Sequence, residues 1–253
     1  MLAKALAGLL CLGSLVCSYG AHAAEYRFYS AAGAKVPLNE LSQLFNRTQS
    51  DSKIVNYFDT AGAAEKQFLE DPKSSCLVTT QVRINGAIKS GALKGQEQIP
   101  LADTLAGLAS SSAAKPKIGN TQELRNALLN AKFIAFSDPA RGATVGKHFE
   151  EMIKKLGIEK EVMAKAMLAS DGVETMKLVM AKKVELGVTQ MSEVIQADRS
   201  TLVGPFPPEF ELATRYSLWC KDPSSPEISS YIALLKSRFG AQVFSYNGLR
   251  PVQ

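Results

Sequence analysis

Histidine and cysteine are scarce in this chain. Its 253 residues include two histidines and four cysteines, and no Cys-x-x-Cys spacing occurs. A histidine-rich metal site and the redox chemistry of a paired-cysteine motif are therefore excluded. The sequence also has no phosphate-binding glycine loop, no GxGxxG after its first strand-like segment and no GxSxG turn. We expect no metal and no cofactor, and hydrolytic or redox catalysis is unsupported.

Long apolar runs are also absent, except at the N-terminus. There Lys4 precedes the apolar segment "ALAGLLCLGSLVCSYG", and Ala21 and Ala23 occupy the small-residue positions of a cleavage site. Because the apolar run is too short for a stop-transfer helix, we predict a secretory signal peptide at residues 1–23. A membrane anchor is the alternative interpretation. The cleaved protein is expected in the periplasm, without membrane insertion.

The basic residues form no cluster. The net charge is +5, and losing Lys4 with the signal would leave +4. Without a Lys/Arg run or interleaved aromatic residues, nucleic-acid binding is unsupported. A mild positive balance fits a small anionic ligand.

Two cysteines, Cys76 and Cys220, remain after the predicted cleavage. In an oxidising compartment such a pair either forms a disulfide or persists as two buried thiols. The sequence leaves both possibilities open.

Strand-like and helix-like segments alternate along the rest of the chain. This alternation predicts an α/β fold with mainly parallel sheets and helices on both faces. The segment "TLAGLASSSAAKPK" at 104–117 is the candidate crossing between two domains. Thr121 is expected to cap a helix. A single C-terminal helix is expected at 225–240, with Pro226 in its first turn and Gly240 just past its end.

Several strands end in a turn of small residues that leads directly into a helix. The turns are "YSAAGAKV", "FDTAGAAEK", "FSDPARGATVG", "ASDGVET" and "VTQMSEV". In open α/β sheets, ligands bind at the carboxyl ends of strands, against helix N-termini whose N–H groups are unpaired. Several such turns in one chain indicate an anion-binding site.

The stretch "SDPARGATVGKHF" at 137–149 carries two further candidates. A helix is expected to start near Thr144, with no acidic residue in its first turn. Arg141 lies in the turn and is either a solvated surface arginine or a bidentate partner for a carboxylate. His148, the only histidine after the predicted cleavage site, is either a packed side chain or a donor or proton carrier.

These residues resemble the periplasmic molybdate-binding proteins of ABC transporters, within the type 2 solute-binding fold. The resemblance covers nearly all of the chain after residue 23. Its most specific parts are "YFDTAGAAEKQF" and "FIAFSDPARGATVGKHFEEMIKKLGI". It implies two lobes with the ligand cleft between them. Residues 24–105 and 219–253 would form the first lobe, and residues 106–218 the second.

The ligand positions implied by the resemblance differ from the molybdate pattern. Gly33 and Ala61 stand where the family has two serine hydroxyls, with Ser30 and Thr60 nearby. Gln190 replaces a tyrosine. We therefore expect a small organic polycarboxylate rather than molybdate.

Further ligand-binding candidates are Val173, which matches a valine with a contributing backbone, Thr144, and the cationic residues Arg83 and Arg141. Arg83 also fits a simple surface role.

Two functions remain open. The first is a monomeric solute-binding protein that delivers its anion to an ABC permease. The second is suggested by "SDPARGAT" and "ELGVTQMSE", which are similar to the aconitate isomerase branch of this broad family. An allylic proton shift would require a base, for which His148 is the candidate. A sensor that signals through a partner has no positive support.

Overall fold

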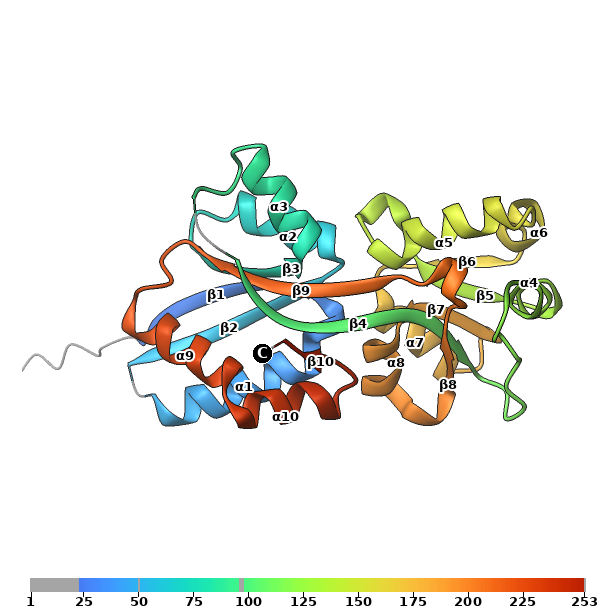
Figure 1. Ribbon diagram of the computed structural model, residues 1–253. Coiled ribbons are helices and arrows are strands. Elements are labelled where there is room, and N and C mark those ends of the chain that lie inside the picture. The colour runs from blue at the N-terminus through green and yellow to red at the C-terminus, as the bar shows by residue number, and fades with distance from the viewer. Residues whose placement is uncertain (1–22, 50, 96–97, 253) are drawn as a thin grey trace, which may run out of the picture.

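The computed structural model describes residues 23–49, 51–95 and 98–252. Residues 1–22, almost all of the predicted signal peptide, lie outside this range. The strands form one ten-stranded sheet with the central order β2-β1-β3-β9-β4-β7-β5-β6, and β8 and β10 both pair with β4 (Figure 1). The strands are β1 Ala24–Ala31, β2 Ser52–Asp59, β3 Ser74–Thr80, β4 Ile99–Ser110, β5 Ile134–Ser137, β6 Ala166–Ala169, β7 Leu186–Gln190, β8 Leu202–Pro205, β9 Ala213–Cys220 and β10 Arg250–Pro251.

Helices cover both faces at each end of this sheet. At the β1–β3 end, one face is covered by α1 Lys35–Thr48, α9 Pro226–Lys236 and α10 Arg238–Tyr246, and the other by α2 Ala61–Glu70 and α3 Gln81–Lys89. At the β5–β7 end, the helices are α4 Thr121–Asn130, α5 Thr144–Lys155 and α6 Glu159–Met163 on one face, and α7 Gly172–Met180 and α8 Met191–Asp198 on the other. The predicted two-lobed α/β fold is confirmed.

The apolar stripes of the sequence account for this packing. In α1, Leu38, Leu41 and Phe45 recur at helical spacing and pack with Phe28 of β1. In α5, Phe149 and its neighbours one turn along pack in the same way into the core of the second lobe. Each lobe therefore has its own core.

Strands β4 and β9 run between the lobes (Figure 1). Residues 99–105 of β4 pair with β9, whereas residues 106–110 pair with β7. β9 pairs only with β3 and β4 among the described strands. We therefore propose that the chain crosses back into the first lobe before Ala213, rather than after residue 218.

The expectation of mainly parallel sheets is corrected to a mixed sheet. β1 pairs in parallel with β2 and β3, as β5 does with β6 and β7. All pairings of β4 and β9 are antiparallel. The reason is that these two strands carry the chain back and forth between the lobes, against the direction of their neighbours.

Two helix boundaries differ from expectation. Asn120, not Thr121, caps α4 by accepting a hydrogen bond from the backbone N–H of Glu123. The expected single C-terminal helix is broken at Ser237, and Gly240 lies in the first turn of α10. A Cβ on Gly240 would lie 2.5 Å from the carbonyl oxygens of Leu234 and Leu235, so glycine permits this close approach.

Cys76 and Cys220 form a disulfide between β3 and β9. The two residues lie opposite each other in the antiparallel ladder, which brings their side chains together. The sequence could not decide between a disulfide and two free thiols, because the pair is 144 residues apart along the chain.

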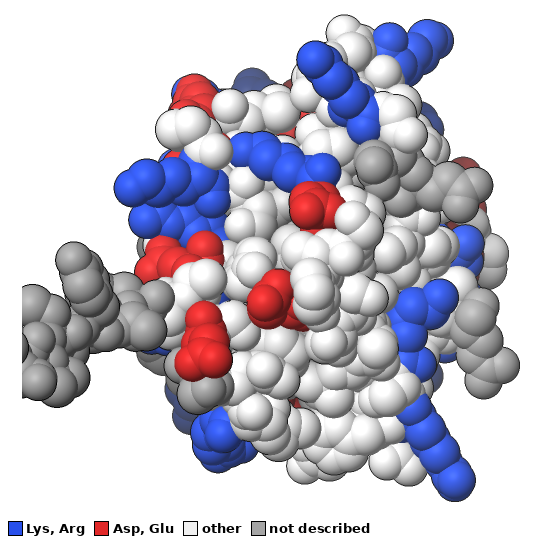
Figure 2. Space-filling view, turned by 90° about the vertical axis from the view of Figure 1, so that its left-hand side faces the viewer, with Lys and Arg blue, Asp and Glu red and all other residues white. Residues whose placement is uncertain are grey.

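Charge is mixed on the outer face of the first lobe. Figure 2 shows described Lys and Arg side chains scattered among Asp and Glu on this face, without one continuous basic patch. Within residues 23–49, 51–95 and 98–252, no helix is long and apolar enough to cross a membrane.

Candidate functional site

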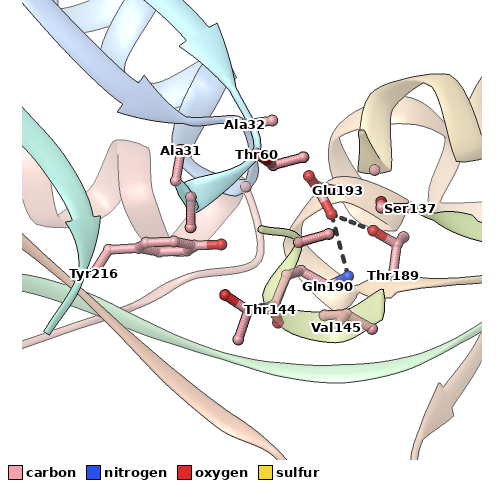
Figure 3. Close-up of a pocket in the computed structure, with 14 residues that line it drawn as sticks. Ala31, Ala32, Thr60, Ser137, Thr144, Val145, Thr189, Gln190, Glu193 and Tyr216 are labelled. Carbon is pink, nitrogen blue, oxygen red and sulfur yellow. Dashed lines mark hydrogen bonds between the residues drawn. The ribbon is translucent and has the colours of Figure 1, made fainter. Parts of the chain in front are cut away.

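A pocket lies between the lobes, where strand ends meet helix N-termini (Figure 3). Its cavity has a volume of about 30 Å³, room for two or three water molecules or for one carboxylate group. None of the lining residues is Lys or Arg. They are Ala31, Ala32, Gly33, Thr60, Ala61, Ser137, Ala143, Thr144, Val145, Gly172, Thr189, Gln190, Glu193 and Tyr216.

Several helices begin at this pocket. Ala61 and Thr144 are the first residues of α2 and α5, whose first turns carry no acidic side chain. Gly172 is the first residue of α7, and Gly33 belongs to a short 3-10 helix directly before α1. Helix N-termini present unpaired N–H groups and a positive dipole end. The arrangement attracts an anion without a cationic side chain.

Glu193, in the first turn of α8, is the charged side chain of the pocket. It is 7% exposed. Its Oε2 accepts a hydrogen bond from the Thr189 hydroxyl and another, at 3.2 Å, from the backbone N–H of Gln190. Burial outweighs these two bonds and raises the pKa of Glu193 to about 7. The carboxyl group can therefore gain or lose a proton near neutral pH.

Tyr216 of β9 faces the same pocket (Figure 3). Burial, with a smaller contribution from the charge of Glu193, holds the pKa of Tyr216 well above its usual value. The phenol is therefore a neutral hydrogen-bond donor at physiological pH. Gly33 makes room for it, since a Cβ at that position would overlap the Tyr216 hydroxyl oxygen.

The structure brings five of the candidate residues together in the pocket. They are Gly33, Thr60, Ala61, Thr144 and Gln190. Each lies in or next to a strand-to-helix turn, as the turn pattern indicated. The Gln190 side chain is also engaged elsewhere, because its Nε2 donates to Thr214 Oγ1 at 2.9 Å.

The two candidate arginines lie beside the pocket, at the contact between the lobes. This contact, the seam, consists of Asp59–Gly62 from the first lobe and Arg141–Ala143 from the second. Thr60 Oγ1 donates to the carbonyl of Arg141 at 2.5 Å, and the Gly62 N–H donates to the carbonyl of Gly142 at 3.2 Å. Both bonds hold the lobes closed over the pocket.

Both arginines form ion pairs with carboxylates. Arg141 Nη2 contacts Asp59 Oδ1 across the seam at 3.0 Å, and Arg141 Nε donates to the carbonyl of Ser170 at 2.9 Å. Arg83 Nη1 contacts Glu65 at 2.5 Å. Both arginines line a wider hollow on the outer side of the seam.

Besides the two arginines, three candidates lie outside the pocket. Ser30 is fully buried, and its Oγ has no hydrogen-bond partner among the described residues. Val173 follows Gly172 but does not line the cavity. His148 Nε2 is 2.8 Å from the carbonyl oxygen of Phe210, and its ring lies near Phe206. These contacts fit the packed role that the sequence left open for His148.

Sequence reasoning missed Glu193 and Tyr216. Glu193 lies within "ELGVTQMSE", but a glutamate at the third helical position is typical of ordinary N-terminal capping. Tyr216 lies inside a strand that showed no site signal. Among the described residues, no group of three His, Cys, Asp or Glu side chains could hold a metal.

A family model for bacterial extracellular solute-binding proteins matches residues 26–250. The chain belongs to this family. Among curated proteins, this solute-binding protein is 23% identical over 198 residues to an aconitate isomerase from Pseudomonas sp., covering 77% of this chain and 74% of that protein. The resemblance drawn from the sequence is confirmed.

Solved structures support the same fold. The periplasmic molybdate-binding protein of Azotobacter vinelandii matches with a TM-score of 0.70 and 14% identity, over 90% of this chain and 100% of that one. PEB3, known from Campylobacter jejuni, was solved with bound L-phospholactate; it matches with a TM-score of 0.63 and 16% identity, over 89% of this chain and 99% of that one. At these identities, the likeness concerns the fold.

Proposed function

We propose that this solute-binding protein binds a small organic polycarboxylate in the periplasm and delivers it to an ABC permease. The observation that carries the proposal is a pocket without cations, built from helix N-termini, directly beside a seam bordered by two arginines. This combination offers two different subsites for negatively charged groups, an inner one in the pocket and an outer one at the two arginines.

The inner subsite suits one carboxyl group. The cavity is too small for a whole tricarboxylate while the lobes are closed. Hydroxyl groups of Thr144 and Tyr216 and the N-termini of α2 and α5 would hold its oxygens.

The outer subsite is formed by Arg83 and Arg141. A guanidinium matches a carboxylate with two parallel hydrogen bonds. At present Glu65 and Asp59 supply those carboxylates. A second carboxyl group of the ligand would replace at least one of them when the lobes close around it.

The relatives favour the same ligand class. The curated relative is named for aconitate, a tricarboxylate, and PEB3 was solved with an organic anion that carries a carboxylate and a phosphate. The A. vinelandii relative is named for molybdate, so that oxyanion is the natural competitor in a binding test.

The test is calorimetric titration of the protein, purified without residues 1–23, with tricarballylate, citrate, sulfate and molybdate. We expect a tricarboxylate to bind with one-to-one stoichiometry and at least tenfold more tightly than molybdate. Tight molybdate binding with no polycarboxylate binding would overturn the proposal.

A second candidate function is isomerisation of aconitate. The observation that favours it is Glu193, whose carboxyl group lines the pocket and has a pKa of about 7. Ionised Glu193 would take a proton from the methylene carbon of aconitate as the double bond shifts. The same proton would then return to the other end of the allylic system, with no change in oxidation state.

This second function is tested by incubating the protein with cis-aconitate and following trans-aconitate by NMR. Conversion beyond one equivalent, abolished in Glu193→Gln but kept in His148→Gln, is the result expected of an isomerase with Glu193 as its base. An unchanged cis-aconitate spectrum would leave the binding function alone standing.

A further inference from the structure

The two oxygens of the Glu193 carboxyl group have different surroundings. Oε2 accepts hydrogen bonds from the Thr189 hydroxyl and the Gln190 N–H. Oε1 has no hydrogen-bond partner among the described residues, and in Figure 3 it points away from both donors into the pocket. Because Oε2 is the acceptor, a proton on this group would reside on Oε1, facing the ligand.

Among the described residues, none supplies a compensating positive side chain to Glu193. The titratable groups that face it are Asp171, at the N-cap of α7, and Tyr216 of β9. Asp171 is acidic, and Tyr216 remains neutral. The lining residues include no Lys or Arg. An anion that enters the pocket would therefore lie next to a like-charged, buried carboxylate, an arrangement that is strongly unfavourable.

Protonation of Glu193 removes this repulsion between the carboxylate and the anion. Protonated Glu193 carries no charge, and its Oε1–H becomes a donor to an oxygen of the anion. The backbone of α7 holds the group in place, since a Cβ on Gly172 would overlap the Glu193 carboxyl. Retreat of the carboxylate from the ligand is blocked on that side.

We propose that the bound state holds one proton shared between Glu193 and the anion, so that anion binding takes up a proton from solvent whenever Glu193 begins ionised. The inference rests on the proposed binding function and does not require turnover. No covalent bond other than the O–H bond forms or breaks.

The raised pKa sets the pH window of the effect. With a pKa of about 7, Glu193 in the free protein is half ionised at pH 7 and about 90% ionised at pH 8. Proton uptake on binding should therefore rise from about 0.5 at pH 7 to about 0.9 at pH 8. Affinity should fall about tenfold per pH unit above pH 8.

The experiment is calorimetric titration with tricarballylate at pH 7, 8 and 9, in pairs of buffers with different ionisation enthalpies. Tricarballylate has no double bond to isomerise, and its carboxyl groups are essentially ionised throughout this range. The slope of binding enthalpy against buffer ionisation enthalpy gives the number of protons taken up.

Two variants assign the proton to its carrier. Glu193→Gln places an amide donor where the protonated acid would stand, so it should bind tricarballylate with no proton uptake and no loss of affinity between pH 7 and 9. His148→Gln replaces the imidazole whose Nε2 lies 2.8 Å from the carbonyl oxygen of Phe210. Because His148 lies outside the pocket, this variant should keep the full uptake.

The outcomes separate the inference from the function on which it rests. If neither tricarballylate nor citrate binds at any pH, the proposed ligand class is wrong. If tricarballylate binds without proton uptake, or if the uptake persists in Glu193→Gln, the shared proton is disproved while the binding function stands.

Discussion

At the scale of single residues, the role of a side chain depends on the groups it contacts as well as on its residue type. Arg141 was singled out from the sequence as a carboxylate clamp, and in the closed structure it does bind a carboxylate, that of Asp59. The Arg141 side chain is 43% exposed, so the ion pair itself adds little stability. Its importance for binding comes from its position, since the same guanidinium lines the hollow on the outer side of the seam.

This position leads to opposite effects for the two partners. Arg141→Ala should weaken tricarballylate binding about 10–100-fold, the equivalent of one charged hydrogen bond of about 1.5–3 kcal/mol. Asp59→Asn frees the guanidinium and should leave the affinity unchanged or raise it. Titration calorimetry checks both. If Asp59→Asn weakens binding as much as Arg141→Ala does, Arg141 acts by closing the seam and does not touch the ligand.

At the scale of elements, the seam depends on the close approach of two turns. Gly62, at the start of α2, and Gly142, after the Asp-Pro turn, are in direct backbone contact. A Cβ on Gly62 would lie 2.8 Å from the Cα of Gly142 and would also overlap the Arg83 guanidinium. Gly142 also has a φ of 76°, in the left-handed region that favours glycine. The small-residue turns therefore serve closure as well as ligand approach.

Gly62→Ala should hold the seam open and lower tricarballylate affinity at least tenfold, with the unfolding midpoint unchanged or slightly raised. Gly86→Ala is the matched control, because it also replaces a helical glycine but its Cβ would meet nothing within 4 Å. Calorimetry and urea denaturation measure the two effects. Equal affinities for the Gly62→Ala and Gly86→Ala variants would show that the seam tolerates a side chain.

At the scale of the whole molecule, β9 connects the disulfide, the pocket and the crossing between lobes. Cys220 is bonded to Cys76 at one end of the strand, Tyr216 faces the pocket, and Ala213 is at the other end. The cross-link ties the returning strand to β3 of the first lobe. It thereby closes a loop that contains the whole second lobe.

Removing this cross-link should destabilise the fold without abolishing binding. In the chain-entropy account, closing a loop of 144 residues contributes about 5 kcal/mol. The double variant Cys76→Ala/Cys220→Ala should unfold at a lower urea concentration, and wild type with reductant should behave alike. Neither cysteine lines the pocket, so ligand binding should persist. Coincident urea curves with and without reductant would refute a stabilising role.

The sequence by itself determined the local structure of this protein. Apolar spacing specified the helices, and strand-to-helix turns placed Thr60, Ala61 and Thr144 at the pocket, since the chain must leave a strand and start a helix there. Local patterns mispredicted the C-terminal helix. Its break is associated with a tertiary contact, because Gly240 of the second helix packs closely against the end of the first.

Only the tertiary structure decided the chemistry of the site. In the sequence, Glu193 has the pattern of a capping residue. In the folded protein, burial removes water from its carboxyl group and raises its pKa. Tyr216 becomes a pocket residue because β9 returns past the first lobe. Arg141 finds Asp59 only because two lobes meet, although the residues are 82 positions apart. Desolvation and long-range pairing depend on the whole fold, and no local pattern of residues contains them.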